Sequence, residues 1–439
     1  MQRHSLTREV IRIAWPMVIS ELGDSLYSIA DTYFVSKIGT IALAAVSVGS
    51  YLSWLFFVIV ALFSIGILVY IAQSYGAGAI KEAKCALGES ILFGVLVSST
   101  VAMIVYHSAP FLIGLIVGPN EELINVAFKY FSIRILGLPI LAAALIMDSA
   151  VRAVGATKLS MIAILSSAFL NIALDPVFIF GLLGFPKMGV AGAALATVIS
   201  IAYMIPLEFI FLKKLSLIPL FSLRPRYVIR VTRVGLPAAT ERLIFSIGNN
   251  AYISFIARCG NAALAAHQIG IRIESFIYMP GFAFSVAASA LVGQRIGAGN
   301  IEEGKHIGME TAKIATTLMT ILGIAVAITA TYLVTPFSPD ENVAKLATLY
   351  LILAGLSEPG LALVMTLSGA IRGGGNTLIP MVLNASGLYL FRVLPAAILT
   401  GIMGVIGAWI AMFIDVYLRG LIFLITYRKF FIKLVKRVI

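Results

Sequence analysis

Charged residues are scarce in this sequence. They account for 12% of its 439 residues, whereas hydrophobic residues account for 60% and the mean hydropathy is +1.02. A soluble domain carries about 25% charged residues. So few charges cannot cover the surface of a soluble body of 46.9 kDa, which excludes a soluble globular enzyme. The same excess of hydrophobic residues excludes a disordered chain.

The residues that build metal sites and hydrolytic sites are also few. The two cysteines, Cys85 and Cys259, give neither a disulfide framework nor a metal-ligand spacing, and the four histidines are scattered. No Lys-Ser or Lys-Thr pair follows the glycine-rich segments at the spacing of a phosphate-binding loop, and nothing resembles a nucleophilic triad. We therefore expect no enzyme, no ATPase and no organic cofactor.

Long apolar runs are what the sequence has instead. A membrane-spanning helix needs about 20 mainly apolar residues, and continuous runs of this kind argue against the shorter alternating segments of a β-barrel. The sequence thus predicts an all-α, multi-pass membrane protein with about twelve helices. They are placed at 10–34, 45–75, 86–107, 122–151, 159–182, 190–213, 228–258, 264–295, 308–335, 343–371, 378–402 and 404–430.

Basic residues fix the expected orientation. There are 32 Lys and Arg against 20 Asp and Glu, and the excess falls mainly at the two termini and in alternate loops. Cytoplasmic loops carry an excess of Lys and Arg, so both termini are predicted to be cytoplasmic. In a membrane protein this charge does not indicate nucleic-acid binding. We expect a protein of the cell membrane, with the lipid bilayer as its surroundings.

The two halves of the sequence repeat. "GTIALAAVSVG" from Gly39 matches "GNAALAAHQIG" from Gly260, and "QSYGAGAIKEA" from Gln73 matches "QRIGAGNIEEG" from Gln294, both 221 residues later. We predict two six-helix lobes, 1–215 and 231–439, joined by a cytoplasmic linker at 216–230. Six helices per half give both lobes the same orientation, related by a pseudo-two-fold axis along the membrane normal. Such lobes suit a transporter that works by alternating access, although a channel or a flippase would also fit.

Acidic residues are concentrated in the first predicted helix. Glu21, Asp24, Ser28 and Asp31 are spaced by three or four residues and share one helix face. Ionisable side chains within a membrane span are costly and are candidates for function. The equivalent positions of the second half are not acidic, so a cation site is expected in the N-terminal lobe.

Further oxygen ligands follow in the same half. Asn171 and Asp175 lie one turn apart, and Pro176 is expected to kink their helix and free a carbonyl group. Thr197 and Asp148 offer a hydroxyl and a third carboxylate. Two carboxylates in one low-dielectric cavity cannot both be ionised comfortably, so the site is expected to hold H⁺, or Na⁺ at Asp31, Asn171, Asp175 and Thr197.

Structural explanations compete with this hypothesis. Asp148 is spaced to pair with Arg152, and Asn171 is of a type that joins helices by hydrogen bonds. Charged residues of both signs in the second half are typical of ion pairs that hold a helix bundle together. They are Glu241, Arg242, Arg272, Glu274, Glu358, Arg392, Asp415 and Arg419.

Several segments resemble the MATE (multidrug and toxic compound extrusion) family, and the prokaryotic DinF-like branch in particular. They include "WPMVISELGDSLYSIADTYFVSKIGTIALAA", "LNIALDPVFIFG", "GVAGAALAT", "GQRIGAGN" and "LSGAIRGGGNT", and they span nearly the whole chain. The resemblance implies a V-shaped pair of six-helix lobes and the export of amphipathic, often cationic, small organic compounds in exchange for H⁺ or Na⁺. The chain is expected to act as a monomer, because one chain holds the complete repeat.

The resemblance also implies roles for single residues. Asp31 would be central to ion coupling, and Tyr27, Tyr130, Asn171, Asp175 and Thr197 would surround it, with Tyr27, Ser28 and Tyr130 lining the cavity. Pro16 and Pro176 would act as hinges. The alternative function is that of a flippase for lipid-linked precursors in the same superfamily, which Arg272 or Arg392 in a central position would favour.

Overall fold

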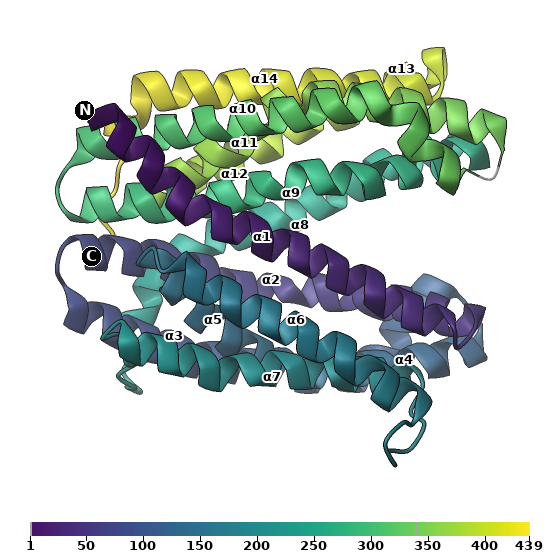
Figure 1. The fold of residues 1–439 in the computed structure, drawn as a ribbon, viewed down its shortest axis with the longest axis horizontal. Helices are drawn as coiled ribbons and strands as arrows, with labels where there is room; N and C mark the ends of the chain where they lie inside the picture. Colours follow the sequence, from purple (N-terminus) through teal and green to yellow (C-terminus); the bar gives the residue numbers. More distant parts are fainter. Residues whose placement is uncertain (1, 339) are drawn as a thin grey trace. The chain divides into compact units, whose positions relative to one another are not determined.

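The computed structural model describes residues 2–338 and 340–439, and nearly all of this range is helical. The first half contains α1 (Gln2–Ser36), α2 (Thr40–Gly76), α3 (Ile80–Val117), α4 (Glu121–Leu136), α5 (Leu138–Ala153), α6 (Thr157–Phe180) and α7 (Val190–Lys214). The second half contains α8 (Val228–Arg258), α9 (Asn261–Gly297), α10 (Ile301–Val334), α11 (Glu341–Gly373), α12 (Leu378–Gly387), α13 (Leu394–Met403) and α14 (Val405–Leu434). Figure 1 shows these helices as long, closely packed rods.

Every predicted span corresponds to helical structure, so the all-α membrane fold is confirmed. Nine helical segments of the described range are long and apolar enough to cross a membrane, and α4 with α5 forms a tenth as a bent pair. The long helices α1 and α8 complete a set of twelve; they are less apolar because they carry several charged residues.

Two spans depart from the single straight helices that were expected. The span at 122–151 is divided into α4 and α5, which are bent by 45° at Gly137. Pro139 lies in the first turn of α5 and has no backbone N–H to continue the hydrogen bonding of α4. The span at 378–402 contains a π-helical segment, Leu388–Val393, between α12 and α13.

The repeat is visible in the positions of the helices. The ends of α2, at Thr40 and Gly76, recur at Asn261 and Gly297 of α9, 221 residues later at both ends. The residues before these helices, Gly39 and Gly260, both have a positive φ, of 142° and 109°. Only glycine adopts such a backbone readily, which explains why both copies of the turn carry it.

The chain divides into two compact units. One comprises Leu22–Ala239 and is called the N-unit here; the other comprises Met1–Glu21 with Thr240–Ile439 and is called the C-unit. Both α1 and α8 thus contribute to each unit, with the change of unit a few residues after Pro16 in α1 and after Pro237 in α8. The lobe limits predicted from the sequence, 1–215 and 231–439, remain a prediction.

Small residues allow the helices of the N-unit to pack closely. A Cβ atom on Gly235 of α8 would lie 1.8 Å from the backbone oxygen of Leu62 in α2, and one on Gly66 would lie 2.3 Å from that of Val231. These reciprocal contacts fix the first turns of α8 against α2. Glu89 of α3 adds to this contact, because its carboxylate accepts the backbone N–H groups of Tyr227 and Val228 at 2.7 and 3.0 Å.

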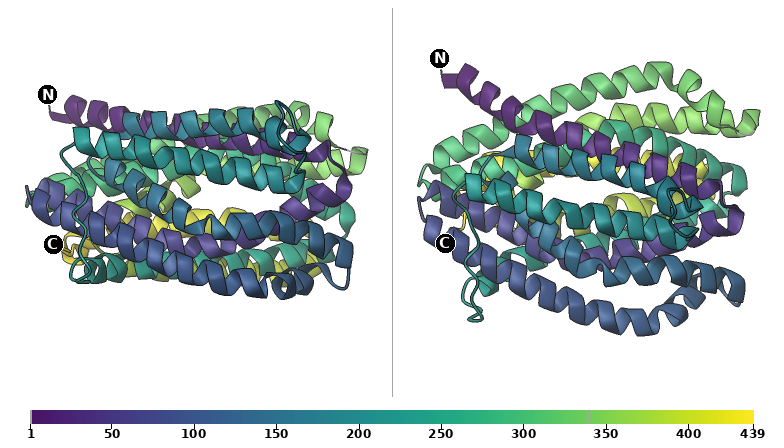
Figure 2. Two further views of the ribbon diagram at one scale, coloured as in Figure 1. Left: turned by 90° about the horizontal axis from the view of Figure 1, so that it is seen from below. Right: turned by 60° about the horizontal axis from the view of Figure 1, so that its bottom comes forward.

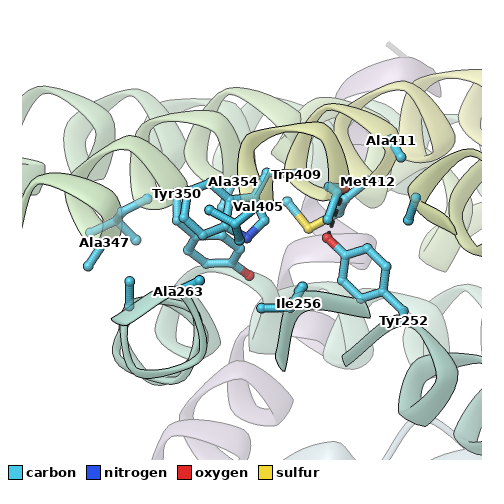
Figure 3. Packing of buried hydrophobic residues seen from close by; sticks show 14 of the residues in the cluster. Tyr252, Ile256, Ala263, Ala347, Tyr350, Ala354, Val405, Trp409, Ala411 and Met412 are labelled. Carbon is cyan, nitrogen blue, oxygen red and sulfur yellow. Dashed lines mark hydrogen bonds between the residues drawn. The ribbon is translucent and has the colours of Figure 1, made fainter. Parts of the chain in front are cut away.

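The C-unit has an aromatic core between α8, α9, α11 and α14. Tyr252, Tyr350 and Trp409 are among its largest fully buried side chains. The Tyr252 hydroxyl donates to the backbone oxygen of Ala408 at 3.0 Å, and Figure 3 shows it pointing toward α14. In both views of Figure 2 most of the long helices run lengthwise beside their neighbours.

Candidate cation site

Three helices of the N-unit bring the predicted acidic residues together. Tyr27 and Asp31 lie one turn apart on α1, Asn171 and Asp175 one turn apart on α6, and Thr197 lies on α7. At Gly23 the missing side chain makes room for Leu165 of α6, so α1 and α6 can approach closely. The structure thus places these side chains on α1, α6 and α7 of one unit, and that they form one functional site stays a prediction.

Hydrogen bonds connect four of these side chains. The Thr197 hydroxyl donates to the backbone oxygen of Ala193 at 3.0 Å, so the Tyr27 hydroxyl, at 3.2 Å, is the donor to Thr197 Oγ1. With the Asn171 amide turned so that both of its atoms are satisfied, it donates to Asp175 Oδ2 at 3.0 Å and accepts from the Thr197 backbone N–H at 3.1 Å. The amide and the hydroxyl are thus already used in holding α1, α6 and α7 together.

Two carboxylate oxygens in this site have no partner. Asp175 is fully buried, and its Oδ1 atom, like Oδ1 of Asp31, lacks a hydrogen bond within the described residues. Leaving a buried carboxylate oxygen unpaired is costly, and the charges of Asp31 and Asp175 also repel each other. A bound cation or proton would remove both penalties. The arrangement can therefore bind positive charge.

The other predicted cavity residues lie around this core. Tyr130 of α4 is buried, and its hydroxyl lies 3.2 Å from that of Ser50 on α2. Ser28 is exposed on α1, where its backbone oxygen accepts from Thr32, so it is not part of the buried cluster. Arg134, one turn after Tyr130, has an electrostatic interaction with Asp31 that the sequence analysis did not anticipate. A charged residue such as Arg134 inside an otherwise apolar predicted span could have pointed to it from the sequence.

Asp148 belongs to a different cluster of the N-unit. Its carboxylate forms an ion pair with Arg152 Nε at 2.7 Å and accepts from the Ser160 hydroxyl of α6. Glu208 of α7 is fully buried and interacts electrostatically with Asp148 and Arg152. The described contacts of Asp148 thus match the structural explanation. Glu208 was missed, although it is an acid within an apolar run, two residues after Pro206.

The two proposed hinge residues lie inside continuous helices. Pro16 lies in the part of α1 that belongs to the C-unit, and its backbone oxygen accepts from the Ser20 hydroxyl at 3.0 Å. Pro176 directly follows Asp175 in α6. A proline removes the hydrogen bond to the residue four positions earlier, so each helix is weakened there without being interrupted.

Several charged residues of the C-unit are paired, whereas both carboxylate oxygens of the fully buried Glu358 lack a hydrogen-bond partner among the described residues. Arg372 bonds to both carboxylate oxygens of Glu241 at 2.7 Å, and the Asn384 amide also donates to Glu241. Arg392 of the π-helical segment pairs with Asp415 at 2.8 Å, as does Arg419 at 2.5 Å. The expectation of ion pairs that hold the bundle together is met by these residues.

The model of one protein family matches the chain twice, at residues 16–177 and 237–398. The two matches are displaced by 221 residues, the period of the repeat, and together they cover more than half of the chain. The chain belongs to the MatE family. Members of this family are membrane transporters and not enzymes, so the expectations of a multi-pass membrane protein and of a non-enzyme are confirmed. The narrower DinF-like assignment stays a prediction.

Curated MatE relatives and solved structures cover almost the whole chain. A probable multidrug resistance protein NorM of Thermotoga maritima is 29% identical to this chain. The alignment covers 94% of this chain and 90% of the NorM chain. An FAD transporter of Shewanella oneidensis is 25% identical, and the alignment covers 94% of this chain and 92% of the FAD transporter. The MATE transporter VcmN of Vibrio cholerae, in a mutant form, has a TM-score of 0.92 at 20% identity, covering 99% of both chains. This last likeness supports the two-lobe MATE fold.

The two MatE segments differ at the candidate site. The positions equivalent to Asp31 and Asn171 in the second segment hold Tyr252 and Arg392. Where the first segment places unpaired carboxylate oxygens, the second thus places an arginine that Asp415 neutralises. The repeat has retained the fold in both halves, whereas the positions equivalent to Asp31 and Asp175 in the second segment carry no acid.

Proposed function

We propose that this protein is a secondary active multidrug efflux transporter, which exports amphipathic, cationic organic compounds in exchange for a cation by alternating access. The observation that carries the proposal is the acidic pair of Asp31 and Asp175, each with a buried oxygen that has no hydrogen-bond partner in the part of the chain that the structure describes. Membership in a family of transporters and relatives named as multidrug resistance proteins support it.

The contacts favour H⁺ over Na⁺ as the coupling ion. Na⁺ needs several oxygen ligands at once, whereas the Asn171 amide and the Thr197 hydroxyl already bond to neighbouring groups. Unpaired carboxylate oxygens remain, and a single proton neutralises one of them. A cationic substrate and the proton would compete for the same negative charge, which is the basis of exchange. One charge crossing 100 mV supplies about 2.3 kcal/mol.

The membrane orientation is part of the proposal. Both termini lie on the cytoplasmic side, as the distribution of Lys and Arg predicts. The protein works as a monomer in the cell membrane, with Pro16 and Pro176 as the flexible points of α1 and α6. Protonation of Asp31 would change its pairing within the N-unit and so alter the cavity around Tyr27 and Tyr130.

The proposal is tested by efflux from proteoliposomes. A fluorescent organic cation is loaded, and a pH gradient or a Na⁺ gradient is imposed separately. We expect efflux driven by the pH gradient in the wild type and its loss in Asp31→Asn and Asp175→Asn. Glu121→Gln, which removes an exposed acid in the first turn of α4, is the matched control and should export normally.

Two outcomes would contradict the proposal. Full coupling in both Asp31→Asn and Asp175→Asn would remove the acidic pair from the mechanism, and dependence on Na⁺ alone would exclude H⁺ as the ion. If folded wild-type protein exported nothing under either gradient, the flippase of lipid-linked precursors would become the better hypothesis. That function would be measured by the translocation of a labelled lipid-linked precursor.

A further inference from the structure

A pocket of about 210 Å³ lies within the N-unit, between α2, α4, α5 and α7. Its polar side chains are Ser50 and Ser53 of α2 and Arg134 of α4. Trp54 and Phe57 of α2 line it as aromatic residues, and the remaining lining is aliphatic apart from Gly137. One cation, two hydroxyl groups and an apolar lining therefore face the same space.

Arg134 differs from four other arginines of the helix bundles. Arg152, Arg372, Arg392 and Arg419 each form an ion pair with a carboxylate at 2.5–2.8 Å. Among the described residues the Arg134 guanidinium has no hydrogen bond and no ion pair, and its Nε atom is buried without a partner. Tyr130, Tyr27 and Asp31 act on it electrostatically, and in the described part of the chain none of them forms a hydrogen bond or ion pair with it.

An unpaired guanidinium inside a helix bundle is expensive. Arginine has five N–H donors in a fixed planar arrangement, and buried charges are normally paired. The chain neutralises its four comparable arginines with its own acids but leaves Arg134 open to the pocket. This contrast indicates that a ligand from outside the chain completes its bonding.

The bend between α4 and α5 shapes the pocket on the side of Arg134. α4 and α5 are bent by 45° at Gly137, where a Cβ atom would lie 2.6 Å from Val198 of α7. The bend and this close approach fix the walls on either side of Arg134. A preformed site loses less conformational entropy when it binds a ligand.

We propose that this pocket binds the carboxylate end of an amphipathic organic compound. The carboxylate accepts from the Arg134 guanidinium, the Ser50 and Ser53 hydroxyls lie within the same pocket, and the apolar part of the ligand packs against Trp54 and Phe57. The volume is below the roughly 300–1,000 Å³ of sites that enclose a drug-sized molecule, so the pocket takes one charged end and an adjoining ring. This rests on the proposed function and deepens it, because it assigns Arg134 as the group that holds the carboxylate of a substrate.

The binding test needs no ion gradient. Wild-type protein in nanodiscs of neutral lipid is titrated calorimetrically with 4-nitrobenzoate, with its neutral analogue 4-nitrobenzamide, and with empty nanodiscs as the blank. We expect 4-nitrobenzoate to bind and the amide to bind at least about tenfold more weakly, a difference of about 1.4 kcal/mol. The nitro group also quenches tryptophan fluorescence, and Trp54→Phe should remove most of that quenching.

Variants of α4 assign the charge that is responsible. Arg134→Gln should weaken 4-nitrobenzoate binding at least about tenfold, and Arg134→Lys less, because lysine keeps the charge but loses the planar donors. Lys129→Gln removes an exposed charge from the same helix and should bind like the wild type. Thermal unfolding of each variant establishes whether it is folded. If Arg134→Gln does not fold, the comparison of Arg134→Lys with the wild type still tests the proposal.

Several results would overturn the inference. They are no binding to the wild type, equal binding of carboxylate and amide, wild-type affinity in Arg134→Gln, or full quenching in Trp54→Phe. Failure of the proposed efflux function is separate, because it is seen as a lack of gradient-driven transport in a wild type that still binds 4-nitrobenzoate. If the protein transports a cation but does not bind 4-nitrobenzoate, only the proposal of a carboxylate-binding pocket is rejected, and the proposed efflux function stands.

Discussion

Removing Arg152 should destabilise the N-unit far more than removing the charge of its partner Asp148. Asp148 is 2% exposed and lies 2.7 Å from Arg152, whose side chain is 15% exposed, so the ion pair is largely shielded from water. Breaking a buried ion pair by removing one partner costs about 3–5 kcal/mol. Arg152→Ala should reach the upper part of that range, because it leaves Asp148 and the fully buried Glu208 without a cation.

Asp148→Asn should cost less, about 1–3 kcal/mol. Asparagine keeps a side-chain oxygen that accepts from Ser160, and Glu208 remains as an acid for Arg152. Glu208→Gln should be close to neutral, since neither Glu208 carboxyl oxygen has a hydrogen-bond partner among the described residues, while the Asp148–Arg152 pair stays intact. The structure therefore predicts a ranking of the three variants, with Arg152→Ala the least stable.

The ranking is measured by SDS titration of purified protein in mixed micelles, with circular dichroism as the signal. Lys158→Ala, which removes an exposed cation from the first turn of α6, is the control. Equal losses for Arg152→Ala and Asp148→Asn would refute the reasoning that Glu208 substitutes for Asp148. Folded Asp148→Asn should also retain ion-coupled efflux, and loss of coupling without loss of stability would return Asp148 to the cation site.

Two further substitutions test the packing of α8 against the N-unit. Gly235→Ala places a Cβ atom 1.8 Å from the Leu62 backbone oxygen and should lower the free energy of unfolding by about 1–3 kcal/mol or more. The control is Gly401→Ala, whose Cβ atom would meet nothing within 4 Å. It should leave the thermal unfolding temperature unchanged. Glu89→Ala removes the acceptor of two backbone N–H groups at the start of α8 and should cost about 1–2 kcal/mol in the same measurement. Glu89→Gln, which keeps an acceptor oxygen, should recover part of this loss; stability equal to the wild type in Glu89→Ala would contradict the capping role.

Local patterns in the sequence were sufficient for the helices and for part of the site. A membrane-spanning helix satisfies its own backbone hydrogen bonds, so length and hydropathy alone locate it, and the 221-residue repeat revealed that the chain contains two related halves. The one-turn spacing of Asn171 and Asp175 placed them on one helix face because an α-helix has 3.6 residues per turn. These inferences needed no knowledge of which helices are neighbours.

Contacts between distant residues were decided by the tertiary structure. The spacing of Asp148 fitted both the cation site and a pair with Arg152, and only the packing of α5, α6 and α7 brought it to Arg152, Ser160 and Glu208. Arg134 and Arg392 look alike in the sequence, yet of these two only Arg392 forms an ion pair with a carboxylate of the described residues. Charge is a property of one residue, whereas its neutralisation depends on which helices pack together, so the sequence supplied the charged groups and the fold determined which of them remained available to bind a ligand.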